Sequence, residues 1–284
     1  MLTPMPMPKI VYGTAWKKER TADLVVKAVL SGFNGIDTAC QPKHYREELV
    51  GQALSELSSK HSIPRSSLWI QTKYTALGGQ DTSKPLPYDP KSSVESQVKS
   101  SVQTSLRQLG VEYVDGLLLH SPLPTYEQNT QAWRLLETFV ADGKIRHLGI
   151  SNIYQPSLLR KMIDFATVPV GIVQNRWWEG NGWDWEILDI CREHGIRYQS
   201  FWTLSGNPTL LKSEPIIQLS ESHNLTPQQV LFKFCQSIGI TPLSGTTTEE
   251  HMAQDVAVES APDFSPSEIR GLETALREAA NRMG

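Results

Sequence analysis

The sequence predicts a single α/β domain in which eight parallel strands, each followed by a helix, close into a (β/α)8 (TIM) barrel. Eight short runs of branched apolar residues alternate with segments in which apolar residues recur every three or four positions. The 284 residues are close to the roughly 250 typical of this fold, and no change of composition divides the chain. An open, doubly wound sheet is the alternative, but no GxGxxG motif follows the first run, which disfavours a dinucleotide-binding sheet of that kind.

The eight apolar runs are the candidate strands. They occupy residues 9–16, 35–38, 68–73, 114–120, 147–152, 171–176, 197–202 and 239–244. A last helix is predicted over 265–283, because Ser265, Pro266 and Glu268 form the pattern of a capped helix start. Residues 1–8 contain three prolines at alternate positions and are expected to form an extended lead-in rather than a secretory signal.

Composition and charge exclude several classes of protein. A net charge of −3 does not fit a strongly basic nucleic-acid binder, and no apolar run approaches the roughly 18–20 residues that span a membrane. Cys40, Cys191 and Cys235 lie far apart without a CxxC spacing, which predicts reduced thiols in a cytoplasmic protein. The histidines form no HxH or HExxH pattern, so no metal site is expected. The sequence does not indicate the oligomeric state.

Two segments are predicted to be active-site loops. Residues 78–93 follow the third candidate strand, are rich in Gly, Pro and Ser, and are longer than an ordinary connection. Residues 175–185 contain four tryptophans, which either line a pocket or an interface or pack beneath the loop. In a barrel both loops would lie at the carboxyl ends of the strands, where active sites form.

Four ionisable residues lie at or just after the ends of neighbouring candidate strands: Asp37, Tyr45, Lys73 and His120. Each alone has a simple structural explanation, but adjacent parallel strands bring all four to one face of a barrel. An ammonium favours the ionised form of a nearby phenol and lowers its pKa from about 10, and a carboxylate keeps that ammonium charged. Such a set can give a proton to a carbonyl oxygen that a histidine orients, while the hydride must come from a nicotinamide cofactor.

The sequence resembles the aldo-keto reductase family, as a divergent member, in an ordered series of motifs. They are GIDTA at 35–39, Tyr45 followed by EELVG at 47–51, QTK at 71–73, YVDGLLLH at 113–120, LGISN at 148–152 and VQN at 173–175. The resemblance implies a (β/α)8 barrel that binds NADP or NAD across the face at the carboxyl ends of its strands and reduces an aldehyde or ketone. It implies Tyr45 as the general acid, Lys73 and Asp37 as the pair that tunes it, and His120 as the residue that orients the carbonyl.

The same resemblance implies residues that hold the cofactor. Ser151, Asn152 and Gln174 would hydrogen-bond the nicotinamide carboxamide, and Phe201 stands where the family places an aromatic ring that stacks on the nicotinamide. Each also has a structural interpretation: Ser151 and Asn152 as a turn or helix cap, Gln174 as a satisfied core amide, and Phe201 as core.

The chain departs from the family near the tyrosine. The family commonly separates the aspartate and the tyrosine by five residues, whereas Asp37 and Tyr45 are eight apart here. Counting back from EELVG without a gap places His44 in the position of the acid. We favour Tyr45, because a phenol beside Lys73 makes the tuned acid, and His44 remains the alternative.

A second departure follows the last strand. The family commonly has a Lys-Ser/Thr pair and then an Arg, which bind the 2′-phosphate of NADPH, but Gly245 and His251 replace the two cations here. Backbone N–H groups from Gly245 onward, with the hydroxyls of Thr246 and Thr247, are expected to hold a phosphate at a helix N-terminus. The composition of this loop therefore predicts that NADH serves as a cofactor equally well as NADPH, or better than NADPH.

Three functions remain open on the sequence alone. The first is an NAD(P)H-dependent carbonyl reductase acting on a small molecule. The second is a non-catalytic relative that binds the nicotinamide cofactor as a sensor or scaffold. The third is a barrel isomerase or lyase of a phosphorylated sugar, for which residues 244–248 would be the phosphate cradle.

Overall fold

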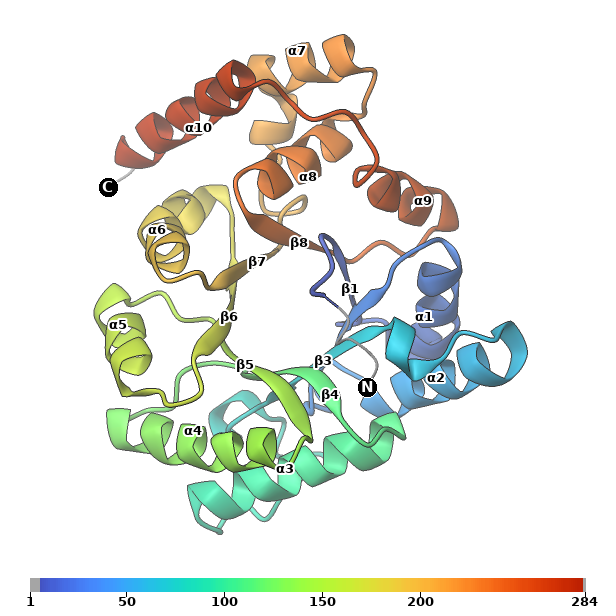
Figure 1. Ribbon diagram of the computed structural model, residues 1–284, viewed down its shortest axis with the longest axis vertical. Coiled ribbons are helices and arrows are strands. Elements are labelled where there is room, and N and C mark those ends of the chain that lie inside the picture. The colour runs from blue at the N-terminus through green and yellow to red at the C-terminus, as the bar shows by residue number, and fades with distance from the viewer. Residues whose placement is uncertain (1–5, 283–284) are drawn as a thin grey trace.

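The computed structural model describes residues 6–282, and its strands close into one parallel barrel (Figure 1). The strands are β1 Val11–Gly13, β2 Gly35–Asp37, β3 Trp69–Tyr74, β4 Val114–Leu119, β5 Ile145–Ser151, β6 Val170–Arg176, β7 Arg197–Phe201 and β8 Ile240–Ser244. Each strand pairs with the next in the sequence, and β8 pairs with β1, so the sheet has no edge. This confirms the predicted barrel and all eight candidate strands, and it excludes the open sheet.

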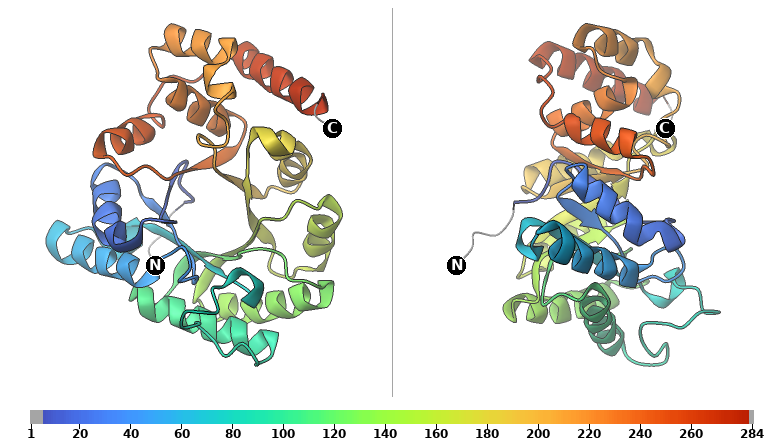
Figure 2. Two further views of the ribbon diagram at one scale, coloured as in Figure 1. Left: turned by 180° about the vertical axis from the view of Figure 1, so that it is seen from behind. Right: turned by 90° about the vertical axis from the view of Figure 1, so that its right-hand side faces the viewer.

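Ten helices surround the strands in the described part of the chain (Figures 1 and 2). They are α1 Thr21–Leu30, α2 Glu47–His61, α3 Val94–Leu109, α4 Tyr126–Ala141, α5 Pro156–Phe165, α6 Trp185–Glu193, α7 Glu214–His223, α8 Pro227–Ser237, α9 Glu249–Ala257 and α10 Pro266–Asn281. Helices α7 and α8 pack on each other, and α10 packs on the short helix η4 (Glu179–Asp184). None of the helices described for residues 6–282 combines the length and apolarity needed to cross a membrane.

The predicted capped start of the last helix is confirmed. The Ser265 side chain accepts a hydrogen bond from the backbone N–H of Glu268, and the Glu268 carboxylate accepts one from the backbone N–H of Ser265 at 2.7 Å. The extended lead-in falls partly on residues 1–5, which lie outside the described residues, and residues 6–8 form neither helix nor strand.

The tryptophan-rich loop combines both interpretations of its composition. Trp177, Trp183 and Trp185 are buried in the main hydrophobic core, which is the packing interpretation. Trp178 is partly exposed, and its ring lies 5.9 Å from that of the exposed Trp202, which follows β7. Of the four tryptophans in this loop, Trp178 alone therefore lies at the surface near the carboxyl ends of the strands.

Candidate active site

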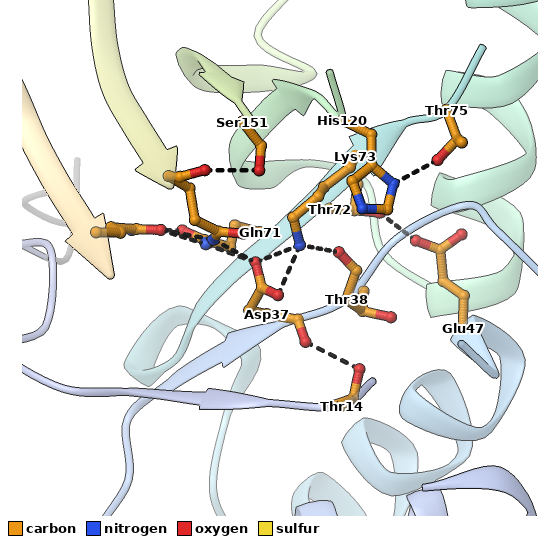
Figure 3. A network of polar contacts seen from close by, with 12 residues as sticks. Thr14, Asp37, Thr38, Glu47, Gln71, Thr72, Lys73, Thr75, His120 and Ser151 are labelled. Carbon is orange, nitrogen blue, oxygen red and sulfur yellow. Dashed lines mark hydrogen bonds and ion pairs between the residues drawn. The ribbon is translucent and has the colours of Figure 1, made fainter. Parts of the chain in front are cut away.

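The four predicted ionisable residues converge at the carboxyl ends of β2, β3 and β4. Asp37 ends β2, Lys73 lies near the end of β3, and His120 directly follows β4 (Figure 3). Tyr45 belongs to the segment between β2 and α2, and its ring centroid lies 5.3 Å from the Lys73 ammonium and 5.8 Å from the centroid of the His120 ring. The closed parallel register places these residues together although they span more than 80 positions of the chain.

Lys73 is buried with its counter-ion. Its side chain is 1% exposed, and its ammonium donates to both carboxylate oxygens of Asp37, at 2.7 and 2.6 Å, and to the carbonyl oxygen of Thr38 at 2.9 Å. Those three bonds use all three ammonium hydrogens. Burial lowers the pKa of Lys73, and the charge and hydrogen bonds of Asp37 oppose this, as expected for a buried ion pair.

The phenol of Tyr45 lies beside Lys73 and His120 but is not made more acidic by them. Burial raises its pKa well above the usual value of about 10, and the Asp37 carboxylate raises it further. The predicted lowering by Lys73 is not found, because Asp37 neutralises the ammonium and takes two of its three hydrogens. Among residues 6–282 the Tyr45 hydroxyl has no hydrogen-bond partner, so its proton is free for a ligand.

His120 is neutral at physiological pH. Its Nδ1 lies 2.6 Å from the Thr75 hydroxyl, and burial lowers the pKa of the ring to about 3, with the positive charge of Lys73 and then His44 adding to the effect. When the Thr75 hydroxyl donates to Nδ1, the ring proton lies on Nε2. The ring can then offer a hydrogen bond to a carbonyl oxygen.

The three extra residues between Asp37 and Tyr45 fold into a turn. The backbone N–H groups of His44 and Tyr45 both donate to the carbonyl of Gln41, at 3.1 and 3.0 Å. The His44 ring stacks on the exposed Trp16 with 3.8 Å between ring centroids. The turn therefore directs Tyr45 toward Lys73 and His120, and His44 toward the rim.

The residues predicted to bind the nicotinamide carboxamide lie on β5 and β6 or, for Asn152, directly after β5. The Ser151 hydroxyl donates to the carbonyl of Gln174 at 2.7 Å, and Asn152 donates from Nδ2 to the carbonyl of His120 at 2.9 Å. Gln174 donates from Nε2 to Asp37 at 2.9 Å, while its Oε1 accepts no hydrogen bond from residues 6–282. Phe201 ends β7 and is partly exposed, so its ring is available at the barrel mouth.

A layer of glutamines beneath Asp37 was not anticipated. Gln71 donates to Asp37 at 2.7 Å, and Gln71 and Gln199 each donate to the other's side-chain oxygen, at 2.7 and 2.9 Å. Asp37 Oδ1 therefore accepts hydrogen bonds from Lys73, Gln71 and Gln174. The available signal was the two-residue spacing of Gln71 and Lys73, which places both side chains on the same side of β3.

Glu47 is a second unanticipated group, and it lies in the first turn of α2. Its side chain is buried, one oxygen accepts from the Thr72 hydroxyl, and the other, Oε2, has no hydrogen-bond partner among residues 6–282. Burial raises its pKa from an ordinary 4.5 to about 7, although neighbouring hydroxyls and Lys73 oppose the shift.

We expect Glu47→Gln to change how stability depends on pH. Because the folded state holds the Glu47 proton more tightly than the unfolded chain, this residue lowers the free energy of unfolding as pH rises from about 4.5 through about 7. The glutamine variant lacks that loss, so relative to the native protein it gains stability between pH 5 and pH 8. Urea unfolding at both values measures the difference, and an equal difference at both pH values would contradict it. Asp184, whose pKa burial also raises to about 7, is present in both proteins and cancels.

The loop over 78–93 packs against Thr75, whose hydroxyl is the hydrogen-bond partner of His120. The Tyr88 hydroxyl donates to the carbonyl of Thr75 at 2.7 Å, and Gln80 donates to the same carbonyl at 3.2 Å. A cavity of about 430 Å³ lies between the β4–α4 and β5–α5 connections, and none of the four ionisable residues lines it. Pro122, Leu123, Asn152 and Tyr154 are among its lining residues.

The predicted phosphate-binding residues lie apart from the ionisable set. Gly245, Thr246 and Thr247 follow β8 and precede α9, with the hydroxyl of Tyr12 donating to the carbonyl of Thr246 at 2.9 Å. No group of three or more His, Cys, Asp or Glu side chains within residues 6–282 has the arrangement of a metal site.

Known proteins are similar to this chain in sequence and in architecture. It is 30% identical over 266 residues to the methylglyoxal reductase DkgB of Salmonella typhimurium, covering 89% of this chain and 87% of that protein. It is 28% identical over 266 residues to the NAD/NADP-dependent indole-3-acetaldehyde reductase of Schizosaccharomyces pombe, covering 88% and 84%. The crystal structure of MGS-M4, an aldo-keto reductase from a deep-sea metagenome library, superposes with a TM-score of 0.80 at 22% identity, covering 96% of this chain and 93% of that one. A structure of the silkworm aldo-keto reductase AKR2E5 complexed with NADPH gives a TM-score of 0.78 at 20% identity, with coverages of 96% and 84%. Residues 9–277 match the model of the aldo/keto reductase family, and the chain belongs to that family.

Proposed function

We propose that this aldo/keto reductase reduces an aldehyde or ketone to an alcohol, with Tyr45 as the proton donor. The observation that carries the proposal is the position of Tyr45, whose ring lies against Lys73 and His120 and whose hydroxyl has no partner among residues 6–282. The raised pKa keeps the phenol protonated at physiological pH, which is the form that a proton donor needs. A bound NADPH or NADH supplies the hydride.

The neighbours of Tyr45 have separate roles. His120, neutral and held by Thr75, donates a hydrogen bond to the substrate carbonyl and orients it toward the Tyr45 hydroxyl. Lys73 and Asp37 are positioning residues. The Lys73 ammonium lies 5.3 Å from the Tyr45 ring centroid, and its ion pair with Asp37 holds it in one position against that ring.

One free polar group at the barrel mouth suits a nicotinamide carboxamide. Oε1 of Gln174 is free to accept from the carboxamide N–H, and Ser151 and Asn152 border it on β5 and the residue that follows. The Phe201 ring offers an apolar face for stacking. Gly245, Thr246 and Thr247 would hold a phosphate at the other end of the cofactor.

A small carbonyl substrate is supported by the names of this chain's relatives rather than by a cavity at Tyr45. The cavity of about 430 Å³ is lined by Asn152, whose amide donates to the carbonyl of His120, but by none of the four ionisable residues. Relatives of this chain are named for methylglyoxal, indole-3-acetaldehyde and D-galacturonate, and these compounds are the first substrates to test.

The experiment is to follow oxidation of NADPH and of NADH with each of these three carbonyl compounds. We expect turnover of at least one, with one alcohol formed for each reduced cofactor consumed. Tight cofactor binding without turnover of any carbonyl compound would instead favour the sensor or scaffold. Conversion of a phosphorylated sugar without a nicotinamide cofactor would favour the isomerase or lyase.

A further inference from the structure

The loop between β8 and α9 lacks the positive charge that a phosphate site needs. Residues 245–248 contain no lysine or arginine, and Glu249 and Glu250 occupy the first turn of α9. The N-cap residue Thr248 makes no side-chain capping hydrogen bond, so this helix start is not closed by its own side chain. From its sequence alone this loop would be a weak site for an anion.

The segment between β1 and α1 brings two cations to this loop. The Lys17 ammonium donates to the carbonyl of Gly245, and Arg20 Nη2 lies 3.5 Å from the carbonyl of Thr247. Lys17 and Gly245 are 228 positions apart in the sequence, and the pairing of β8 with β1 makes the two segments neighbours. The contacts at Gly245 and Thr247 thus place positive charge beside the same loop from which the family's usual cations are missing.

The two cations have no counter-ion in the described part of the chain. Within residues 6–282 neither Lys17 nor Arg20 has a carboxylate within ion-pair distance, and their contacts on this loop are to neutral carbonyl oxygens. Burial lowers the pKa of Lys17, and the positive charge of the nearby Arg20 lowers it further. A phosphate bound at each cation would offset the repulsion between them and gain a charge-assisted hydrogen bond.

We propose that Lys17 and Arg20 supply the phosphate-binding cations of this enzyme, with Arg20 binding the 2′-phosphate of NADPH. This inference rests on the proposed nicotinamide cofactor. Gly245 directly follows β8 at the barrel mouth, whereas Thr247 lies two residues farther along toward α9. A cofactor that extends from Tyr45 toward α9 therefore meets Lys17 first and Arg20 at its adenosine end.

The proposal reverses the cofactor preference that the β8–α9 loop predicts by itself. With Arg20 beside the loop, the native protein binds NADPH more tightly than NADH. Because Arg20 is exposed, its bond to a phosphate is screened by salt, so the preference should weaken as ionic strength rises.

The test compares adenosine 2′,5′-bisphosphate with AMP, which differs only in lacking the 2′-phosphate, alongside NADPH and NADH. Dissociation constants are measured by calorimetry for the native full-length protein, Arg20→Ala, Arg20→Lys, Lys17→Ala and Lys144→Ala. Lys144 is the matched control, because it is exposed and precedes β5, at the opposite end of the barrel from the β8–α9 loop.

We expect Arg20→Ala to weaken the bisphosphate and NADPH about tenfold, or about 1.4 kcal/mol, and to leave AMP and NADH nearly unchanged. Arg20→Lys keeps part of the preference, Lys17→Ala weakens all four ligands, and Lys144→Ala changes none. Unchanged ratios of bisphosphate to AMP and of NADPH to NADH in Arg20→Ala would overturn the assignment while leaving the proposed cofactor intact. If the native protein bound none of the four nucleotides, the proposed function itself would fall, and this inference with it.

Discussion

Tyr45→Phe is expected to lower kcat for carbonyl reduction by about 100- to 10,000-fold, the usual contribution of a general acid. The substitution removes only the hydroxyl oxygen, so the ring keeps its contacts with Lys73 and His120. Because that hydroxyl has no partner among residues 6–282, its loss leaves no protein group unsatisfied. The thermal midpoint and the dissociation constant for the cofactor should therefore stay close to those of the native protein, while steady-state kinetics report the loss.

His44→Ala is the paired control for this prediction. The alignment without a gap places His44 in the position of the acid, but its ring stacks on Trp16, away from the ion pair. We expect this variant to retain most of its kcat. If Tyr45→Phe remained fully active and His44→Ala did not, His44 and not Tyr45 would be the proton donor.

The barrel could be predicted because its signal is local and repeated. Each candidate strand shows as a short apolar run, and the following helix shows its own period, so eight repetitions outweigh an error in any single one. Asp37, Lys73 and His120 could be placed together for the same reason, since parallel strands share one carboxyl end. The limits of the strands were less certain: the predicted run 9–16 contains only a three-residue strand, β1.

Groups that meet only through closure of the barrel could not be predicted in the same way. Gln71 and Gln199 are polar residues in apolar runs, and only the closed register brings their amides into contact beneath Asp37. Lys17 reaches Gly245 because the first strand pairs with the last, and nothing in either segment encodes that contact. The effect of Lys73 on Tyr45 was predicted from charge alone, and it failed because the ammonium is already bound to Asp37.

The glutamine layer also explains why Asp37 and Lys73 can remain charged inside the protein. Both side chains are nearly inaccessible to water, so each charge depends on the other and on hydrogen bonds for its stabilisation. Gln71 and Gln174 donate to the carboxylate, and Thr38 accepts from the ammonium. Every strong hydrogen-bonding position of the ammonium is thus filled, which favours one fixed position for it below the Tyr45 ring.

Lys73→Met is expected to lower the free energy of unfolding by about 3–5 kcal/mol, because it leaves the Asp37 carboxylate buried without a counter-ion. Asp37→Asn should cost a similar amount, since it leaves the ammonium unpaired. The double variant removes both charges, and the amide introduced at position 37 can still accept from Gln71 and Gln174, so it should be more stable than either single variant. Urea unfolding of the four proteins gives the coupling energy. Additive losses in the double variant would mean that the two charges do not depend on each other. Kinetics on the same proteins separate stability from chemistry: we expect the double variant to recover folding but not kcat, because the ammonium that packs against the Tyr45 ring and helps to position its hydroxyl is lost.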